Sequence, residues 1–495
     1  MHRFFYLFLI IPFICGSIKS DATTDFVIVA YNVENLFDID GVAIYNDYKQ
    51  DEADDPYTYT RRKLLTKLIN ARRTLAHFNS GIGPEIVLFQ EFEADFTPQS
   101  TTMNSEEFLL KYSSLSVESM LTDGWQAEFA DISSVHWLLK ALDDIGISGY
   151  HVVSCPAKPI EDNMAHTNAI FSKFPIRWSK SHPLHRARDI IEAELDINGH
   201  CLVVYCNHWK SGASNPNMEN IRVQNAQVLH SLVQAQLSNN PQADIIIGGD
   251  LNSHYNHSSI FADLKTGIND VLGAYGDETF QSSHWYNFWY ELPYELRYSE
   301  VWRGRRGSLM HLISSRGLYD NQGISYIDGS FNHLILPEIN ADIIGRPLEW
   351  NFAGTQGGGT SDHFPVYAYF STRAFTPTSD FSLGEQTPSV EIPHSVKEHP
   401  AVALLKDGAF LSNLSEDNYG SFVGRLYRIE ATIVQMKPLM LRLGGVLWPA
   451  YAADRELMGP SGLQSYLENN EGKVELVIRL NIYRGRKQLL IDAIL

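Results

Sequence analysis

Acidic, amide and imidazole side chains follow apolar runs at several separate places in this chain. In IIIGGDLN, residues 245–252, a β-branched run is followed by Asp250 and Asn252. Such runs are typical of strands buried on both faces, and these strands commonly carry functional groups at their carboxyl ends. Gly-Gly-Asp and Asn are also ordinary turn formers, so this stretch alone does not separate a site from a turn.

Five polar clusters of this kind occur between residues 25 and 371. They are AYNVENLFD (Asn32, Glu34, Asn35), LFQEFE (Gln90, Glu91), VYCNHWKS (Asn207, His208, Lys210), GGDLNSH (Asp250, Asn252) and GTSDHFP (Asp362, His363). Because the carboxyl ends of strands in one sheet converge in space, clusters at equivalent positions indicate a single site. Carboxylate and amide oxygens suit Mg²⁺, and histidine beside aspartate suits proton transfer.

This ordered set resembles the endonuclease/exonuclease/phosphatase superfamily, which includes pancreatic-type deoxyribonucleases, abasic-site endonucleases, sphingomyelinases and inositol phosphatases. The GDLN and SDH pieces carry most of the resemblance. It implies an α+β fold, a four-layer sandwich of two mixed sheets packed face to face with helices outside. It also implies a phosphoesterase that needs Mg²⁺, or Mn²⁺ or Ca²⁺ in its place.

The resemblance also implies a role for each polar residue. Asp250 would orient and deprotonate the attacking water, His208 would protonate the leaving group, and His363 beside Asp362 would polarise the phosphate or transfer a proton. The remaining candidates are Asn32 and Glu91 for the metal, and Asn207, Asn252 and Asn168 for the phosphate oxygens. Turn, cap and core roles remain open as alternatives for several of them, His208 and Glu34 among these.

One position departs from the family pattern. In most relatives the strand that corresponds to RGSLMHLISS carries an aspartate that orients the histidine of the SDH motif, and here that position is Met310. In the serine-protease triad the comparable loss costs on the order of 10⁴ in rate. Either another carboxylate replaces this acid, or the protein is slow or inactive.

Further segments flank the domain predicted for residues 21–372. Residues 1–20 are typical of a secretory signal peptide, because charged residues precede a short apolar core. Residues 373–400, rich in Pro, Ser and Thr, are predicted to be a linker. Residues 401–495 alternate apolar and polar positions, which predicts a small all-β, antiparallel barrel whose last strands resemble an oligonucleotide-binding (OB) fold.

Composition narrows the functions further. The formal net charge of −19 argues against a protein that holds nucleic acid by bulk electrostatics. It does not argue against phosphate chemistry, because a divalent cation supplies positive charge locally. No segment after the signal peptide is long and apolar enough for a transmembrane helix, so we expect no stable membrane anchor.

Three functional hypotheses follow from these observations. The first is an exported metal-dependent phosphodiesterase, periplasmic or extracellular, that acts as a nuclease on nucleic acid. The second is a phosphatase or lipid phosphodiesterase, for which the aromatic residues 284–298 could meet a hydrophobic substrate. The third is a catalytically weakened homologue that binds a phosphate ligand, motivated by Met310. In each case we expect a monomer.

Overall fold

The computed structural model describes most of the chain after residue 22. The described ranges are 23–49, 58–97, 104–281, 285–302, 305–352, 355–377, 402–403, 405–414, 419, 422–452, 456–460, 462–469, 471–483 and 486–495. The predicted signal peptide and most of the predicted linker lie outside these ranges. Within them, no helix combines the length and the apolar character that crossing a membrane requires.

Two seven-stranded mixed sheets form the first part of the molecule. The first has the order β14-β16-β1-β2-β4-β3, with β15 paired to β16, and the second has the order β5-β6-β7-β8-β13-β10-β9. The first sheet comprises β1 (Asp25–Leu36), β2 (Ile86–Glu93), β3 (His151–Ser154), β4 (His166–Ser172), β14 (Ser325–Tyr326), β15 (Asn332–His333) and β16 (Val366–Ser371). The second comprises β5 (Ile176–His182), β6 (Ile190–Ile197), β7 (His200–His208), β8 (Ile245–Asp250), β9 (Ala274–Tyr275), β10 (Trp285–Asn287) and β13 (Met310–Ser315).

The apolar runs are continuous because the central strands are covered on both faces. In β1, Phe26 and Ile28 belong to the core between the sheets, whereas Val27 and Val29 belong to the core under the outer helices. Successive side chains of a strand point to opposite faces, so a strand covered on both sides needs apolar residues at every position.

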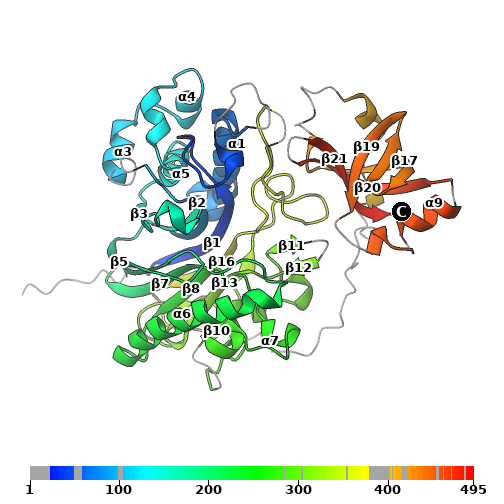
Figure 1. Cartoon of the computed structure of the whole chain (residues 1–495). Helices are drawn as coiled ribbons and strands as arrows, with labels where there is room; N and C mark the ends of the chain where they lie inside the picture. The colour runs from blue at the N-terminus through cyan, green and yellow to red at the C-terminus, as the bar shows by residue number, and fades with distance from the viewer. Residues whose placement is uncertain are drawn as a thin grey trace, which may run out of the picture.

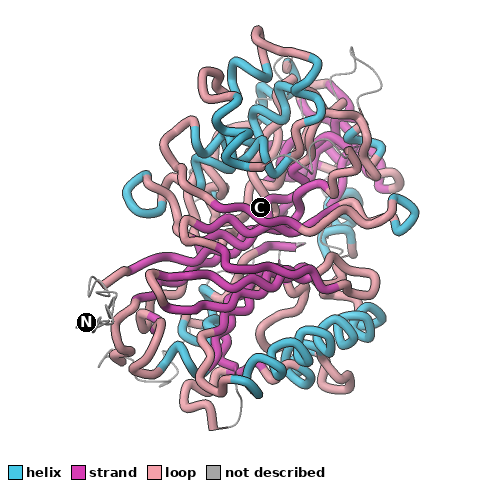
Figure 2. The backbone as a smooth tube through the Cα atoms, turned by 90° about the vertical axis from the view of Figure 1, so that its left-hand side faces the viewer, coloured by secondary structure: helices cyan, strands magenta, loops and turns pink. Residues whose placement is uncertain are grey.

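Helices cover the outer face of each sheet. On the first sheet these are α1 (Arg61–Leu75) and α5 (Ser134–Asp143), against which α3 (Ser105–Lys111) and α4 (Val117–Leu121) pack. The second sheet carries α6 (Glu219–Asn239), followed by the short α7 (His257–Ile260). In α1, Leu64, Leu68 and Leu75 recur at helical spacing and are buried against the sheet. Figure 2 shows the two sheets stacked between these helices, which confirms the predicted four-layer sandwich.

A closed five-stranded barrel follows, as predicted, but it is not wholly antiparallel, because its third and fifth strands pair in parallel. It has the order β17-β18-β19-β21-β20, built from β17 (Leu426–Met436), β18 (Leu439–Leu443), β19 (Val446–Ala452), β20 (Lys473–Tyr483) and β21 (Arg486–Ile494), with α9 (Leu463–Asn469) between β19 and β20. Alternate side chains of β17, such as Tyr427 and Ile429, fill its interior. Its assignment as an OB fold and the domain limits at residues 372 and 401 stay predictions.

Figure 1 shows the barrel beside the layered domain. The two are in contact through a small apolar cluster and a buried ion-pair network. Ile344 of the layered domain packs with Val477 and Ala493 of the barrel. The Arg346 guanidinium lies 2.6 Å from the Asp492 carboxylate and 2.8 Å from that of Asp342. Asp492 also accepts a 2.9 Å hydrogen bond from Arg479 Nε.

Replacing Asp492 by asparagine is expected to loosen this contact. The change leaves Arg346 and Arg479 short of negative charge in a place largely closed to water, and breaking a buried ion pair costs about 3 kcal/mol. Hydrogen exchange read by mass spectrometry should then quicken in peptides from β20 and β21. Glu475→Gln is the control, because the Arg428–Glu475 pair is exposed and is worth no more than about 1 kcal/mol. Equal exchange in the two variants would contradict the prediction.

Candidate active site

The site lies where two parallel strand pairs end, one pair in each sheet. Asn32 and Gln90 are register partners in β1 and β2, and His208 and Asp250 are partners in β7 and β8. Asn32 joins the two pairs, because its Nδ2 donates to Glu91 Oε1 at 3.1 Å and to Asp250 Oδ2 at 3.2 Å. Its side chain is completely buried, so these bonds are shielded from water.

Backbone irregularities aim the carboxylates of the site. Glu91 has φ 67° and lies at a register shift between β2 and β4, whereas strand residues normally have negative φ. A non-glycine residue in this region costs about 1–3 kcal/mol, and such strain is typical of functional sites. Asn35, with φ 55°, donates its backbone N–H to Glu91 Oε2 at 3.1 Å. The bulged strand ends therefore hold the Glu91 carboxylate in one orientation.

Gly249 is required directly before Asp250. It has φ 120°, and a Cβ atom at this position would collide with the backbone oxygen of Asn207 on β7. The glycine thus lets β7 and β8 approach closely enough for His208 and Asp250 to face each other.

Glu91, His208 and Asp250 form a group that could hold a metal ion. His208 Nε2 lies 3.5 Å from Asp250 Oδ2 and 3.8 Å from Glu91 Oε1, and the three ligand atoms are all within 4.8 Å of one another. Two carboxylates and one imidazole suit a divalent cation, and the oxygen-rich share suits Mg²⁺ or Mn²⁺. Asn32 turns its amide N–H groups to both carboxylates, while its Oδ1 accepts from Glu34 N at 2.9 Å. As placed, it orients the carboxylates, and its role as a ligand stays a prediction.

Burial and neighbouring charges shift the pKa of each member of this group. Burial alone would raise the pKa of Glu91, but the neighbouring His166, His208 and Arg188 lower it well below its ordinary value. Burial raises the pKa of Asp250, and the nearby Glu91 adds to this. Burial and Arg188 lower the pKa of His208 well below its ordinary value, so its imidazole is neutral and Nε2 can offer a lone pair.

His363 lies at the same place, on the segment before β16. Its Nε2 is 3.8 Å from Asp250 Oδ2 and 3.7 Å from Asp362 Oδ1. Ser361 anchors this segment, because its Oγ donates to the backbone oxygen of Asn32 at 2.7 Å and accepts from His363 N at 3.1 Å. Burial lowers the pKa of His363, but Asp362, Asp250 and Glu300 outweigh it and raise the pKa to about 9.

Met310 leaves one side of His363 without its expected partner. It is the register partner of Asp250 on β13, so the two side chains project from the same face of the sheet, and Met310 is fully buried in the core between the sheets. Nδ1 of His363 is buried and has no hydrogen-bond partner in the described part of the chain. The structure therefore agrees with the departure seen in the sequence.

Glu300 is a carboxylate near His363 that the sequence analysis did not single out. It begins β11 (Glu300–Trp302), forms an antiparallel bridge with His363, and pairs with Gly307 of β12 (Arg305–Gly307). Bridge partners project to the same face, and the missing side chain of Gly307 leaves room for the Glu300 carboxylate. Burial raises the pKa of Glu300 to about 7, and His363 opposes this shift. Only the non-local bridge identifies this residue.

The three asparagines predicted to bind phosphate already have protein partners. Asn207 donates to Tyr205 O at 3.0 Å and accepts from Trp209 Nε1 at 3.2 Å. Asn252 donates to Trp209 O at 3.2 Å, and Asn168 donates to Asp189 O at 2.8 Å. A phosphate would therefore use the second N–H of each amide, and these roles stay predictions.

A hydrogen-bond chain leads outward from Glu91. Asn35 Oδ1 lies 2.6 Å from His166 Nε2, and Nδ1 of the same ring lies 2.8 Å from the Arg188 guanidinium. Because arginine only donates, Nδ1 accepts and the proton of the neutral ring sits on Nε2. Burial lowers the pKa of His166 to about 4, which agrees with a neutral ring. Arg188 was not predicted, since nothing in its local sequence marks it.

Glu34 supports the segment that carries the SDH motif. Its Oε2 accepts from Trp350 N at 2.6 Å, and Lys67 of α1 donates to Thr360 O at 2.6 Å. Burial, with Asp362 adding to it, raises the pKa of Glu34 well above its ordinary value. These contacts give Glu34 a structural role next to the site.

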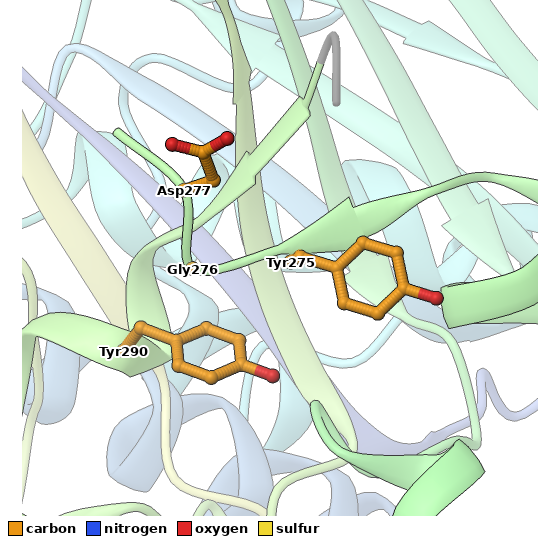
Figure 3. Close-up of a pocket in the computed structure, with 4 residues that line it drawn as sticks. All are labelled: Tyr275, Gly276, Asp277 and Tyr290. Carbon is orange, nitrogen blue, oxygen red and sulfur yellow. The ribbon is translucent and has the colours of Figure 1, made fainter. Parts of the chain in front are cut away.

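The hollow in Figure 3 lies elsewhere. It has a volume of about 490 Å³, is lined by Tyr275, Gly276, Asp277 and Tyr290, and opens at β9, which is the edge strand of the second sheet. It shares no residue with the group around Asp250, and its lining contains one carboxylate and no histidine. The candidate chemistry therefore belongs to the strand ends.

One family model matches part of the chain. Residues 164–372 match the model of a family described as "Endonuclease/Exonuclease/phosphatase family". This range contains His208, Asp250, Asp362 and His363, and no curated protein matches the chain.

The chain is also similar to several solved structures of low sequence identity. TDP2 from D. rerio complexed with single strand DNA product is 12% identical and covers 70% of this chain and 99% of its own, with a TM-score of 0.37. A family protein from Leptotrichia buccalis is 12% identical, covering 69% and 98%, with a TM-score of 0.38. Beta toxin from Staphylococcus aureus is 14% identical, covering 69% and 99%, with a TM-score of 0.37.

Proposed function

Because the chain carries, in residues 164–372, a domain of the endonuclease/exonuclease/phosphatase family, we propose that it is a metal-dependent phosphodiesterase that hydrolyses nucleic acid. The observation that carries the proposal is the meeting of Glu91, His208 and Asp250 with His363 at the ends of strands from both sheets. The signal-peptide pattern of residues 1–20 supports the further proposal that it acts outside the cytoplasm.

The residues of the site divide the chemistry among them. Glu91, Asp250 and His208 would hold a divalent cation, which when bound neutralises charge on the phosphate. Asp250 also accepts hydrogen bonds from Asn252 N at 2.8 Å and Asn32 Nδ2 at 3.2 Å, so its carboxylate is fixed and can orient a water molecule.

The two histidines differ in their surroundings. His363 lies between the carboxylates of Asp250 and Asp362, which favour its protonated form, so we assign it as the proton donor to a phosphate oxygen. His208 lies in the group that could hold a metal ion. A histidine whose Nε2 binds a metal ion cannot use that atom to protonate the leaving group, which is the role predicted for it. The pair thus divides into a cationic donor and a neutral ligand.

The lipid alternative loses the feature that motivated it. Within the aromatic stretch 284–298, Trp285, Tyr286, Phe288 and Trp289 are buried and Tyr298 is only 4% exposed. In contrast, the Tyr294 side chain is 73% exposed. A segment that buries its own rings offers little surface to a lipid phase.

A barrel residue gives modest support to nucleic acid as the substrate. Tyr451 on β19 is 50% exposed, and an exposed aromatic ring on a barrel strand can stack with a base. The strands therefore retain one of the features that a single-strand-binding barrel needs.

Incubation of the mature protein with supercoiled plasmid tests the proposal. We expect nicking in Mg²⁺ or Mn²⁺ and none in EDTA, because the carboxylates of the site need a cation beside a phosphate. Agarose gels of a time course give the rate. Release of phosphate from small esters, or cleavage of phospholipid, with no nicking of DNA or RNA would replace the nuclease by the phosphatase or lipid alternative. Silence on every substrate would favour the weakened homologue.

A further inference from the structure

Three cationic side chains near the candidate active site form no ion pair in the described part of the chain. Arg186 and Arg188 belong to the loop between β5 and β6, and Lys210 follows the end of β7. Within the described ranges none of the three forms an ion pair. Two neighbouring cations do form ion pairs: Lys158 lies 2.6 Å from Asp189, and Arg222 lies 2.6 Å from Glu219. The chain as a whole has a net charge of −19, so a local group of cations that form no ion pair is unusual in it.

The loop is held rigidly against the end of β7. The Asn225 side chain from α6 accepts from Lys210 N at 3.2 Å and donates to His185 O at 3.1 Å. Lys158 Nζ donates to Ala187 O at 3.0 Å. The Asn225 side chain thus holds the backbone of Lys210 close to that of His185. Because Arg186 and Arg188 follow His185 in the same loop, the three cations belong to one region.

The hydrogen-bond chain through Asn35 and His166 ties this region to Glu91. The Arg188 guanidinium lies 2.8 Å from His166 Nδ1, and its Nε is buried without a hydrogen-bond partner in the part of the chain that the structure covers. An anion would satisfy this buried donor and balance the positive charges of the group.

We propose that Arg186, Arg188 and Lys210 form a second anion subsite, which binds a phosphate of the substrate adjacent to the phosphate attacked beside Asp250. The subsite rests on the proposed function, and it narrows the substrate to a phosphodiester chain with at least two neighbouring phosphates. A substrate with a cationic headgroup such as choline would meet like charge at this place.

Cleavage selectivity tests the subsite. The two probes are hexathymidylate with phosphodiesters throughout, and the same oligomer with an uncharged methylphosphonate at every linkage except the central one. The native protein should cleave the fully charged oligomer with a kcat/KM about tenfold or more higher, since a charge-assisted hydrogen bond is worth at least one power of ten. In Arg186→Gln/Lys210→Gln this preference should fall towards one.

The matched control is Arg62→Gln/Lys180→Gln. It removes the same net charge from two exposed positions, one on α1 and one on β5, so it reports the long-range effect of charge alone. This control should keep the preference of the native protein. A preference that survives in Arg186→Gln/Lys210→Gln, or that the control also loses, overturns the subsite.

A binding measurement separates failure of the subsite from failure of the proposed function. Calorimetry in EDTA with thymidine 3′,5′-bisphosphate needs no turnover, and we expect Kd to rise about tenfold or more in Arg186→Gln/Lys210→Gln and to stay unchanged in the control. Binding with this pattern in a protein that cleaves nothing would uphold the subsite and reject the nuclease. Equal binding by all three proteins would reject the subsite, whatever the protein cleaves.

Discussion

Asp250→Asn is expected to lower kcat/KM for phosphodiester cleavage by a factor on the order of 10³, within the range for general acid–base groups. The amide keeps the size of the carboxylate and can still accept from Asn252 N, so the fold around β8 should persist. It loses the negative charge that lies 3.5 Å from His208 Nε2 and 3.8 Å from His363 Nε2. Steady-state cleavage of a fluorescent oligonucleotide in Mg²⁺ gives the ratio.

Asp244→Asn is the matched control for this variant. Asp244 directly precedes β8, at the end of the strand away from the site, and its Oδ2 accepts from Ile324 N at 2.7 Å. The same substitution at this similarly buried aspartate should leave cleavage within about twofold of the native rate, because a change far from the site has little effect on the energetics of the site. Comparable losses in both variants would mean that the first loss is structural, and Asp250 would lose its assignment.

Glu300→Gln is expected to lower kcat for the same cleavage by about tenfold to a hundredfold and to change KM little. Glu300 projects from the same face as its bridge partner His363, whose Nδ1 has no hydrogen-bond partner in the described ranges. We therefore expect Glu300 to act as a positioning residue. It would supply the negative charge near His363 that the family's aspartate supplies at the position of Met310. No hydrogen bond joins Glu300 to the ring in the described ranges, so we expect a smaller loss than the roughly 10⁴ seen when a directly bonded orienting acid is removed.

Moving the carboxylate tests this role. Met310→Asp in the Glu300→Gln background should restore part of kcat, because position 310 projects from the same face as Asp250. Met310→Asn in that background introduces a polar group of the same size without the charge, and should restore nothing. If Glu300→Gln cleaves like the native protein, or if Met310→Asn restores kcat as well as Met310→Asp, then Glu300 does not act through its negative charge. Unfolding curves of each variant show whether burying an acid at position 310 has instead weakened the fold.

The layered fold, and the strand ends at which polar residues gather, were largely predictable from local sequence. Strands covered on both faces need apolar residues at every position, so runs such as that of β1 are visible without a structure. Polar residues directly after such runs, as in Asp250 after Ile247 and the two glycines, point to a strand end. The alternation that lines the barrel interior with Tyr427 and Ile429 is equally local.

Partner choice was decided only by the tertiary structure. Ser361 bonds to Asn32, 329 residues away, and Arg346 to Asp492, 146 residues away, and no local pattern encodes such pairs. Glu300 and Arg188 were missed for the same reason, because their significance comes from a bridge to His363 and a hydrogen bond to His166. Periodicity and turn chemistry report whether a residue is buried and where its strand ends. The neighbours it meets there depend on how the two sheets and the barrel pack, and that packing sets the direction and charge state of each side chain.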